Sequence, residues 1–331
     1  MTLAVLSLAC GTELARAVAD RLGVAPLPVE ERAFEDGEHK IRPLACVRGL
    51  EVFLVQGLHG EPGLSADEKI VRTLFLAAAL RDHGAARVTL VAPYLAYARK
   101  DRRTKLRDPV SIRYLAQLVE AVGIERVVAL DVHNPAAFEN AFRIETVHLE
   151  ARPLFLRHLL LRASERPLVV VAPDAGGVKR AEALRRGLEE ALGRPVPLAL
   201  MEKHRSAGVV SGEAFAGEVA GCLALVVDDL VSTGGTMLRC ARACLARGAA
   251  EVRAIATHGL FTGEAAAVLA DPAVAAWLLT DSVPPFRLAA EVRSRVTFVP
   301  IAPLLAEAIR RLHDGRSVEE LGEALPASVE V

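Results

Sequence analysis

Residues 223–236 read Leu-Ala-Leu-Val-Val-Asp-Asp-Leu-Val-Ser-Thr-Gly-Gly-Thr, and this stretch predicts the class of the fold. Its first five residues form a continuous apolar run, which is typical of a parallel strand buried on both faces. Two carboxylates follow, then a turn with two glycines, and then a helical pattern over residues 235–247. A buried strand that leads through a polar turn into a helix is the repeating unit of α/β proteins. We therefore expect a mainly parallel sheet flanked by helices.

The same alternation of short apolar runs and longer helical patterns extends along most of the chain. It starts again after Glu150, so the second half repeats the architecture of the first half. The expected strands are 52–55, 88–92, 127–130, 168–172, 196–201, 223–227 and 252–257, and the expected helices are 67–81, 110–122, 177–191, 235–247 and 302–312. The apolar N-terminus, MTLAVLSLAC, lacks the basic region of a signal peptide and is predicted to be the first strand.

Length and composition describe a folded chain of two domains. A chain of 331 residues exceeds the ~150 residues of a common domain, and we place the domains at 1–150 and 151–331. Hydrophobic residues make up 52% and charged residues 24% of the chain, which is too apolar for a disordered protein. The formal net charge of -1 argues against a nucleic-acid partner that binds through counterion release. Any phosphate site must therefore be local.

Two further features point to a soluble protein of the cytoplasm. No apolar run reaches the ~18 residues of a membrane span, because Asp271-Pro272 interrupts the longest candidate. The five cysteines are scattered along the chain and show no metal-ligand spacing, which favours a reducing compartment. We therefore expect no membrane partner and a cytoplasmic location.

The turn after residues 223–227 has the composition of a site for a phosphorylated sugar. Ligands of open α/β sheets bind at the carboxyl ends of strands, where a following helix offers free N–H groups to an anion. The glycines let the backbone approach a phosphate, and the hydroxyls donate hydrogen bonds. The carboxylates would repel a phosphate, so they accept hydrogen bonds from sugar hydroxyls or hold a cation. A helix N-cap explains the Ser and Thr residues but not the paired acids. The candidate residues are Asp228, Asp229, Ser232, Thr233, Gly234, Gly235 and Thr236.

Other polar residues also follow predicted strands. Asp174 follows residues 168–172, and His133 follows residues 127–130, so both are candidate ligands of a metal ion or a phosphate. Arg99 and Lys100 open a basic loop that could neutralise the polyphosphate of a nucleotide. The remaining basic residues of that loop, up to Arg107, could equally be a solvated surface.

Two turns complete the set of candidates. Residues 34–38, Phe-Glu-Asp-Gly-Glu, place an aromatic ring that can stack on a base beside acids that accept hydrogen bonds, although the pattern alone indicates a turn. Lys203 and Arg205 are two residues apart, so in an extended segment both would face one cleft. Cations of this kind stabilise the charge that develops during phosphoryl transfer. An exposed polar loop is the alternative for this pair.

Together these segments resemble one family, ribose-phosphate diphosphokinase, also called phosphoribosyl pyrophosphate synthetase. The resemblance covers nearly the whole chain and keeps the order of the family's segments. They are FEDGE (34–38), PYLAYARKDRRTK (93–105), LDVH (130–133), PDAGGVKRA (173–181), EKHR (202–205) and VDDLVSTGGT (227–236). The last of these is also similar to the phosphoribosyl-diphosphate loop of phosphoribosyltransferases, and by itself it does not separate the two families.

The resemblance implies two tandem phosphoribosyltransferase-type domains with the active site between them, and Mg²⁺ as cofactor. The anomeric hydroxyl of ribose 5-phosphate would attack the β-phosphorus of Mg-ATP and release AMP. The resemblance also implies a homo-oligomer that is built from dimers and extends to a hexamer in many members. For the nucleotide, the resemblance implies adenosine contacts from a neighbouring subunit by Asp36, Gly37 and Glu38 beside Phe34, and triphosphate contacts by Arg99 and Lys100. It implies Mg²⁺ sites at His133 and Asp174, and a catalytic role for Lys203. Arg205 would contact ribose 5-phosphate and the transition state, and Asp228 and residues 232–236 would bind ribose 5-phosphate.

The chain departs from the family pattern in three places, one of which is the loop after Arg205, which is shorter and less basic than in the common bacterial members. The family usually has Arg-Gln where this chain has Arg99-Lys100, and glutamines in the stretch that here reads 131–142. These regions bear on subunit contacts and on regulation by phosphate and ADP more than on the chemistry. Two alternative functions remain, a phosphoribosyltransferase and a non-catalytic regulatory homologue. The second would be expected to lose Lys203, Arg205 or the acid pair at 228–229, and all are present.

Overall fold

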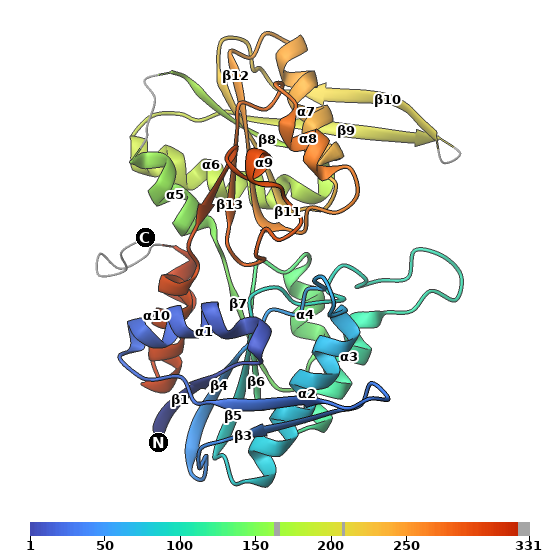
Figure 1. Ribbon diagram of the computed structural model, residues 1–331. Coiled ribbons are helices and arrows are strands. Elements are labelled where there is room, and N and C mark those ends of the chain that lie inside the picture. Colours follow the sequence, from blue (N-terminus) through green and yellow to red (C-terminus); the bar gives the residue numbers. More distant parts are fainter. Residues whose placement is uncertain (162–165, 207–208, 324–331) are drawn as a thin grey trace. The chain divides into compact units, whose positions relative to one another are not determined.

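The computed structural model describes residues 1–161, 166–206 and 209–323, and no side chain between 202 and 213 is described. Two compact units make up the chain: Met1–Glu150 with the segment that starts at Ile301, and Ala151–Pro300. Each unit contains a mainly parallel sheet with helices (Figure 1). The predicted α/β fold with two such sheets is confirmed. Within the described ranges, no helix is both long enough and apolar enough to cross a membrane.

The first unit is built on a five-stranded sheet in the order β1-β4-β5-β6-β7, in which all neighbours are parallel. The strands are buried because apolar residues face both sides. One face packs against α2, α3 and α4, and α1 and α10 lie together on the other side (Figure 1). The elements of this unit are β1 (Thr2–Leu6), α1 (Thr12–Leu22), β2 (Val29–Ala33), β3 (His39–Pro43), β4 (Leu50–Val55), α2 (Ala66–Asp82), β5 (Arg87–Ala92), α3 (Ser111–Ala121), β6 (Arg126–Leu130), α4 (Pro135–Ala141), β7 (Glu145–Leu149) and α10 (Ala302–His313).

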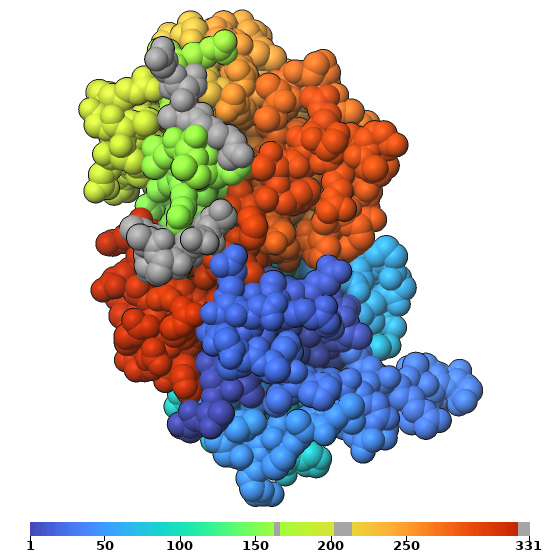
Figure 2. Space-filling model, turned by 60° about the vertical axis from the view of Figure 1, so that its left-hand side comes forward, coloured from blue at the N-terminus to red at the C-terminus, as the bar shows by residue number. Residues whose placement is uncertain are grey.

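Strands β2 and β3 form a separate antiparallel hairpin whose turn is the segment 34–38. The turn was predicted from the sequence, but the two strands were not, because their many charged residues resemble an exposed loop. The hairpin packs on α2, where the His39 ring lies 5.3 Å from the Phe75 ring. Its tip stands out from the surface of the unit as a blue lobe in Figure 2. The residues of the turn are therefore exposed.

The predicted C-terminal helix is confirmed as α10, but it packs on the first unit. The sequence-based division had assigned it to the second domain, because it follows the last strands of that domain. Its amphipathic pattern buries an apolar face beside α1, and the Arg310 guanidinium donates a 2.8 Å hydrogen bond to the carbonyl oxygen of Arg21. Position along the chain does not determine which apolar surface a helix covers.

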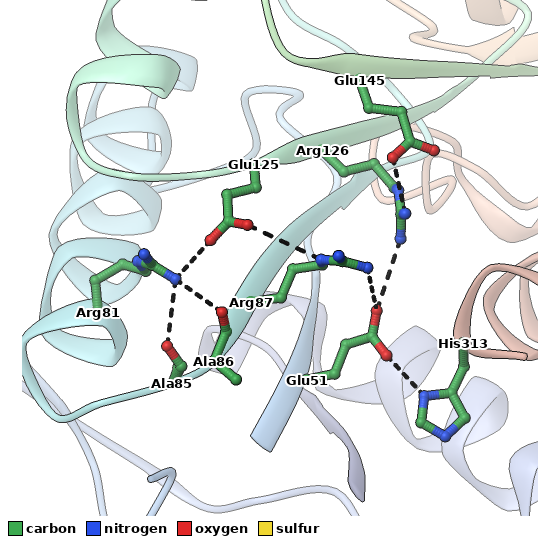
Figure 3. Close-up of polar contacts among 9 residues, drawn as sticks. All are labelled: Glu51, Arg81, Ala85, Ala86, Arg87, Glu125, Arg126, Glu145 and His313. Carbon is green, nitrogen blue, oxygen red and sulfur yellow. Dashed lines mark hydrogen bonds and ion pairs between the residues drawn. The ribbon is translucent and has the colours of Figure 1, made fainter. Parts of the chain in front are cut away.

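A polar network at the amino ends of the parallel strands anchors this helix (Figure 3). The carboxylate of Glu51, on β4, lies 2.7 Å from Nδ1 of His313 on α10. The same carboxylate lies 3.4 Å from Nη1 of Arg87 and 3.7 Å from Nη1 of Arg126, which begin β5 and β6. Glu145 at the start of β7 completes the row, 2.8 Å from Nη2 of Arg126. Because Glu51 is buried, these cations are needed to compensate its charge.

The second unit is built on a seven-stranded sheet in the order β10-β9-β8-β11-β12-β13-β14. Strands β9 and β10 form an antiparallel hairpin at one edge, and the other neighbours are parallel. The elements of this unit are α5 (Arg152–Leu160), β8 (Leu168–Ala172), α6 (Val178–Leu192), β9 (Leu198–Ser206), β10 (Val209–Ala216), β11 (Leu223–Val231), α7 (Gly235–Ala246), β12 (Glu251–Gly259), α8 (Ala265–Ala270), β13 (Ala276–Thr280), α9 (Ala290–Arg293) and β14 (Val296–Val299).

Strands β11 and β9 extend well past their predicted carboxyl ends, because pairing with a neighbouring strand continues into polar sequence. β11 was predicted to end at Val227, but it continues through the acid pair to Val231 as it pairs with β12 up to Gly259. β9 was predicted to end near Met201, but it continues to Ser206 because β10 pairs with it. Pairing with a neighbouring strand therefore extends both strands into polar sequence.

Candidate active site

The loop after β11 is shaped to receive an anion. Gly234 is the N-cap of α7, is buried and has a φ of +79°. A Cβ atom on this residue would lie 2.8 Å from Cγ1 of Val268, so both the backbone conformation and the packing require glycine. With glycine as N-cap, no cap side chain occupies the start of the helix, and Oγ1 of Thr233 makes a long contact of 3.5 Å with the Gly235 nitrogen. Neither Ser232 nor Thr233 is the N-cap, and the start of a helix offers backbone N–H groups that can bind a phosphate.

Asp228 and Asp229 lie at the carboxyl end of β11, next to this loop. Asp228 accepts a 2.9 Å hydrogen bond from the Asp229 N–H. The Arg180 guanidinium on α6 approaches both acids, with Nη1 3.7 Å from Oδ1 of Asp228 and Nη2 3.9 Å from Oδ2 of Asp229. Burial and the neighbouring charge of Asp229 raise the pKa of Asp228 to about 7, although Arg180 opposes the shift. An acid that titrates near neutrality can both accept and donate hydrogen bonds, which suits a pair of sugar hydroxyls.

A second segment, residues 260–263, lies alongside the first half of the loop and supports it. The N–H of Leu260 donates to the Val231 carbonyl oxygen, and the N–H of Thr262 donates to the Ser232 carbonyl oxygen, each at 2.9 Å. The hydroxyls of Ser232 and Thr262 are also hydrogen-bonded, at 2.9 Å. Phe261 in this segment is buried with a φ of +49°, a conformation that costs energy for a residue with a bulky side chain. The local strain shows that the surrounding structure holds this segment in place.

Asp174 follows β8 at the same edge of the sheet. Its Oδ1 accepts hydrogen bonds from the N–H groups of Gly176 and Gly177, at 3.0 and 3.1 Å, and so caps the 3₁₀ turn Ala175–Gly177 that leads into α6. Part of the carboxylate is therefore committed to the turn, which fixes the side chain at the strand end. A carboxylate held in this way can still offer an oxygen to a cation.

In the first unit, the turn 34–38 forms the tip of the β2–β3 hairpin. Gly37 has a φ of +91°, and its N–H donates to the Phe34 carbonyl oxygen at 3.1 Å. Asp36 accepts a hydrogen bond from the Glu38 N–H at 3.0 Å, which stabilises the turn. The Phe34 ring is 37% exposed and lies 5.2 Å from the guanidinium carbon of Arg32. The aromatic ring and the acids are therefore presented together at an exposed tip.

The two basic residues after β5 differ in their surroundings. Arg99 is exposed, and none of the residues that the structure describes binds its guanidinium. Lys100 instead places Nζ 2.6 Å from Oδ2 of Asp108. This carboxylate also accepts hydrogen bonds from the hydroxyl and N–H of Thr104, and these contacts hold the pKa of Asp108 well below its usual range. Lys100 thus closes the basic loop on itself, whereas Arg99 is presented to solvent without a competing partner among the described residues.

His133 is exposed just after β6, in the loop before α4. The neighbouring Asn134 caps α4 through a 3.2 Å hydrogen bond from the Ala137 N–H, and its amide nitrogen donates to Asp101 at 2.7 Å. The loop that carries His133 is therefore tied to the basic loop that carries Arg99. Both follow parallel strands, so they lie at the carboxyl edge of the first sheet.

Lys203 and Arg205 lie on β9, opposite Glu213 and Val210 on β10, and their side chains fall outside the described residues. His133 and Asp174 belong to different units. Within the described residues, no group of three or more His, Cys, Asp or Glu side chains could hold a metal ion by itself.

Comparison with known proteins decides the family. Residues 3–123 match the N-terminal domain of ribose phosphate pyrophosphokinase, and residues 200–322 match the phosphoribosyl synthetase-associated domain. The chain is 35% identical over 311 residues to the ribose-phosphate pyrophosphokinase of Caldanaerobacter subterraneus subsp. tengcongensis, covering 93% of this chain and 94% of the relative. It is 36% identical over 313 residues to the enzyme of the same name from Gloeobacter violaceus, covering 93% of this chain and 90% of the relative. The chain belongs to the ribose-phosphate pyrophosphokinase family.

A solved structure of the family supports the fold as well. The phosphoribosylpyrophosphate synthetase from Mycobacterium smegmatis superposes with a TM-score of 0.85 at 30% identity, covering 95% of this chain and 100% of that chain. The family, the enzyme class and the fold that the sequence predicted are confirmed. The match over residues 3–123 also decides against a phosphoribosyltransferase, because it assigns the first unit to the N-terminal domain of the pyrophosphokinase family.

Three residues near the loop of this ribose-phosphate pyrophosphokinase family member were not predicted from the sequence. Arg180 contacts the acid pair from α6, Thr262 binds Ser232 from the segment after β12, and Arg239 donates a 3.3 Å hydrogen bond to Oγ1 of Thr236 from within α7. For Arg180 a signal was available, since it stands six residues after Asp174 in the same strand-to-helix segment. For Thr262 the sequence offers only a Thr-Gly pair after a strand, which is common in turns.

Proposed function

We propose that this chain transfers the diphosphoryl group of Mg-ATP to the 1-hydroxyl of ribose 5-phosphate, giving 5-phosphoribosyl 1-diphosphate and AMP. The observation that carries the proposal is the loop 228–236, where an acid pair and an open helix start lie at one strand end. The pyrophosphokinase family to which the chain belongs supplies the reaction. A site for a phosphorylated sugar alone would also serve an enzyme that consumes the product.

In this proposal the loop binds both ends of ribose 5-phosphate, the hydroxyls of the ribose and the 5-phosphate. Asp228 and Asp229 would bind the ribose hydroxyls, and residues 232–236 would bind the 5-phosphate through backbone N–H groups and hydroxyls. Arg180 supports the first part because it lies near both carboxylates and compensates their charge. Thr262 supports the second part because it holds Ser232 from the side. The anomeric hydroxyl would then be positioned for attack on the β-phosphorus.

The first unit would bind the nucleotide. Arg99 is the better candidate for the triphosphate, because Lys100 must leave Asp108 before it can bind a phosphate. Phe34, Asp36, Gly37 and Glu38 would contact adenosine at an exposed hairpin tip. Such a tip is suited to reaching the active site of a neighbouring copy, which supports a homo-oligomer built from dimers.

Mg²⁺ is the proposed cofactor, and His133 and Asp174 are its proposed protein contacts. The donor chemistry of these residues fits Mg²⁺. The Asp174 carboxylate is held in place by the turn, and the described residues contain no cluster of ligating side chains. Such a site suits an ion that is held mostly by phosphate oxygens and water. When bound, the ion neutralises the polyphosphate and fixes its orientation. Lys203 and Arg205 would stabilise the charge that develops on the transferring group.

Two further parts of the proposal concern the state of the protein in the cell. Self-association is supported by exposed apolar side chains on α2 and α3, where Val71, Phe75, Tyr114 and Leu118 are between 41% and 55% exposed. A cytoplasmic location is supported by the five cysteines, all of which are free. Sedimentation of the purified protein would measure the size of the assembly.

The activity is tested by incubating purified protein with ATP, ribose 5-phosphate and Mg²⁺ and measuring AMP. We expect AMP and 5-phosphoribosyl diphosphate in equal amounts, and no reaction when Mg²⁺ is chelated. Lys203→Ala should lower kcat by orders of magnitude with a smaller effect on KM, whereas Arg293→Ala, which removes an exposed cation of the same unit, should not. No AMP release from the wild-type protein, with or without added inorganic phosphate, would refute the proposed function and leave the regulatory homologue as the explanation.

A further inference from the structure

Arg239 is a cation in an electrostatically unfavourable place. It is the fifth residue of α7, in the turn that follows the positive end of the helix dipole, which a basic side chain does not compensate. Its Nη2 donates to the hydroxyl of Thr236 at 3.3 Å, and the side chain is exposed. None of the described carboxylates lies within ion-pair distance of its guanidinium. The positive charge of Arg239 is therefore not compensated by a described acid, and residues 232–236 include none.

The other arginine on the exposed side of α7 shows the contrast. Arg242 is also exposed, but its Nη2 lies 2.6 Å from Oδ2 of Asp271, so its charge is compensated within the unit. Both residues belong to the same helix and differ by less than one turn. The uncompensated charge is thus specific to the end of the helix that faces the loop 232–236.

The guanidinium also reaches the part of the loop where a ligand would come closest. A Cβ atom on Gly235 would lie 3.6 Å from Nη1 of Arg239, with Oγ1 of Thr233 at 3.7 Å as its other neighbour. Gly235 leaves this space open, and the N–H groups at the start of α7 point toward the loop. An anion held on those groups would therefore lie within hydrogen-bond reach of Arg239.

We propose that Arg239 is a further phosphate-binding residue, which forms a charge-assisted hydrogen bond with the 5-phosphate of ribose 5-phosphate. This inference rests on the proposed function, since it names an additional ligand of the same substrate. The phosphate compensates both the helix dipole and the guanidinium, and Thr236 holds the side chain in place before the substrate arrives. Arg239 contributes to binding and takes no part in the transfer itself.

The test compares Arg239→Met with Arg239→Lys and with the matched control Arg242→Met. In steady-state assays Arg239→Met should raise the KM for ribose 5-phosphate about 10-fold or more, as expected for a lost hydrogen bond to a charged group. Its kcat and its KM for ATP should stay within about twofold of wild type, because the residue acts on one substrate only. Arg239→Lys should recover part of the loss, and Arg242→Met should behave as wild type.

Isothermal titration with ribose 5-phosphate alone separates this inference from the proposed function. If the wild-type protein binds the sugar phosphate but releases no AMP, the proposed function fails, and the ratio of dissociation constants for wild type and Arg239→Met still decides the role of Arg239. Equal affinities of Arg239→Met and Arg242→Met would overturn the inference, as would a wild-type protein that binds no ribose 5-phosphate. An equal loss in both variants would also overturn it, since that result indicates a general effect of surface charge.

Discussion

The two glycines of the loop provide a sharp test, because the structure gives them different reasons to be glycine. Gly234 has a φ of +79°, and a Cβ atom on it would meet Cγ1 of Val268 at 2.8 Å. Gly235 has no left-handed φ, and the nearest atoms to its Cβ position lie at 3.6 and 3.7 Å. Gly234→Ala should therefore damage the folded unit, whereas Gly235→Ala should fold normally and affect only the binding of a ligand.

The magnitude for Gly234→Ala follows from two terms. A left-handed backbone costs a residue with a Cβ atom about 1–2 kcal/mol, and an overpacked contact of this kind costs about 1–3 kcal/mol. The expected loss in the free energy of unfolding is thus about 2–5 kcal/mol. Gly221→Ala is the matched control, because it has a φ of +71° and no atom within 4 Å, so it carries the first term alone. Gly235→Ala should stay within about 0.5 kcal/mol of wild type.

Trp277 is a suitable probe for this experiment. It is the single tryptophan of the chain, is fully buried on β13, and its ring would lie 3.6 Å from a Cβ atom on Gly234. Its fluorescence during urea unfolding therefore reports on the second unit. Equal unfolding midpoints for Gly234→Ala and Gly221→Ala would show that the contact with Val268 adds nothing to the loss in the free energy of unfolding. A midpoint for Gly235→Ala as low as that of Gly234→Ala would refute the distinction between the two glycines.

Three other predictions concern single contacts. Because the pKa of Asp228 is raised to about 7, the folded chain keeps a proton between pH ~4 and ~7 that the unfolded chain has released. The contribution of Asp228 to stability therefore falls as the pH rises through that window. Asp228→Asn should raise the free energy of unfolding at pH 8 by about 1–3 kcal/mol, should match wild type near pH 4, and should abolish activity. Thr262→Val should raise the KM for ribose 5-phosphate several-fold and Thr262→Ser should restore it, because the hydroxyl holds Ser232; an unchanged KM in the valine variant would contradict this. Lys69 is fully buried, with Nζ 2.9 Å from Oε2 of Glu61. Lys69→Met should therefore destabilise the first unit by about 3 kcal/mol, measured by urea unfolding followed by circular dichroism, and adding Glu61→Gln should recover part of the lost stability. If the losses of the two variants simply add, the two residues do not stabilise each other as a pair.

The sequence alone was sufficient for those features that depend on neighbouring residues along the chain. The alternation of apolar runs and helical patterns predicted two parallel sheets, and the order of six polar segments indicated the family. Turns with glycine and short polar residues or acids, such as 232–236 and 34–38, were located correctly because their chemistry is local. The same locality explains the wrong strand ends at Val227 and Met201, since a strand extends as far as its partner allows.

Only the tertiary structure decided which distant residues meet. Thr262 reaches Ser232 and Arg180 reaches the acid pair because the order of strands in the second sheet brings these segments together, whereas α10 joins the first unit by packing beside α1. A pattern of residue types along the chain carries no information on strand order or on the direction of a long side chain. For this protein, the sequence by itself determined the fold class, the family and the loop that would bind a sugar phosphate. The tertiary structure determined which charges are compensated around that loop, and so identified Arg239 as a cation of α7 without a carboxylate partner among the described residues.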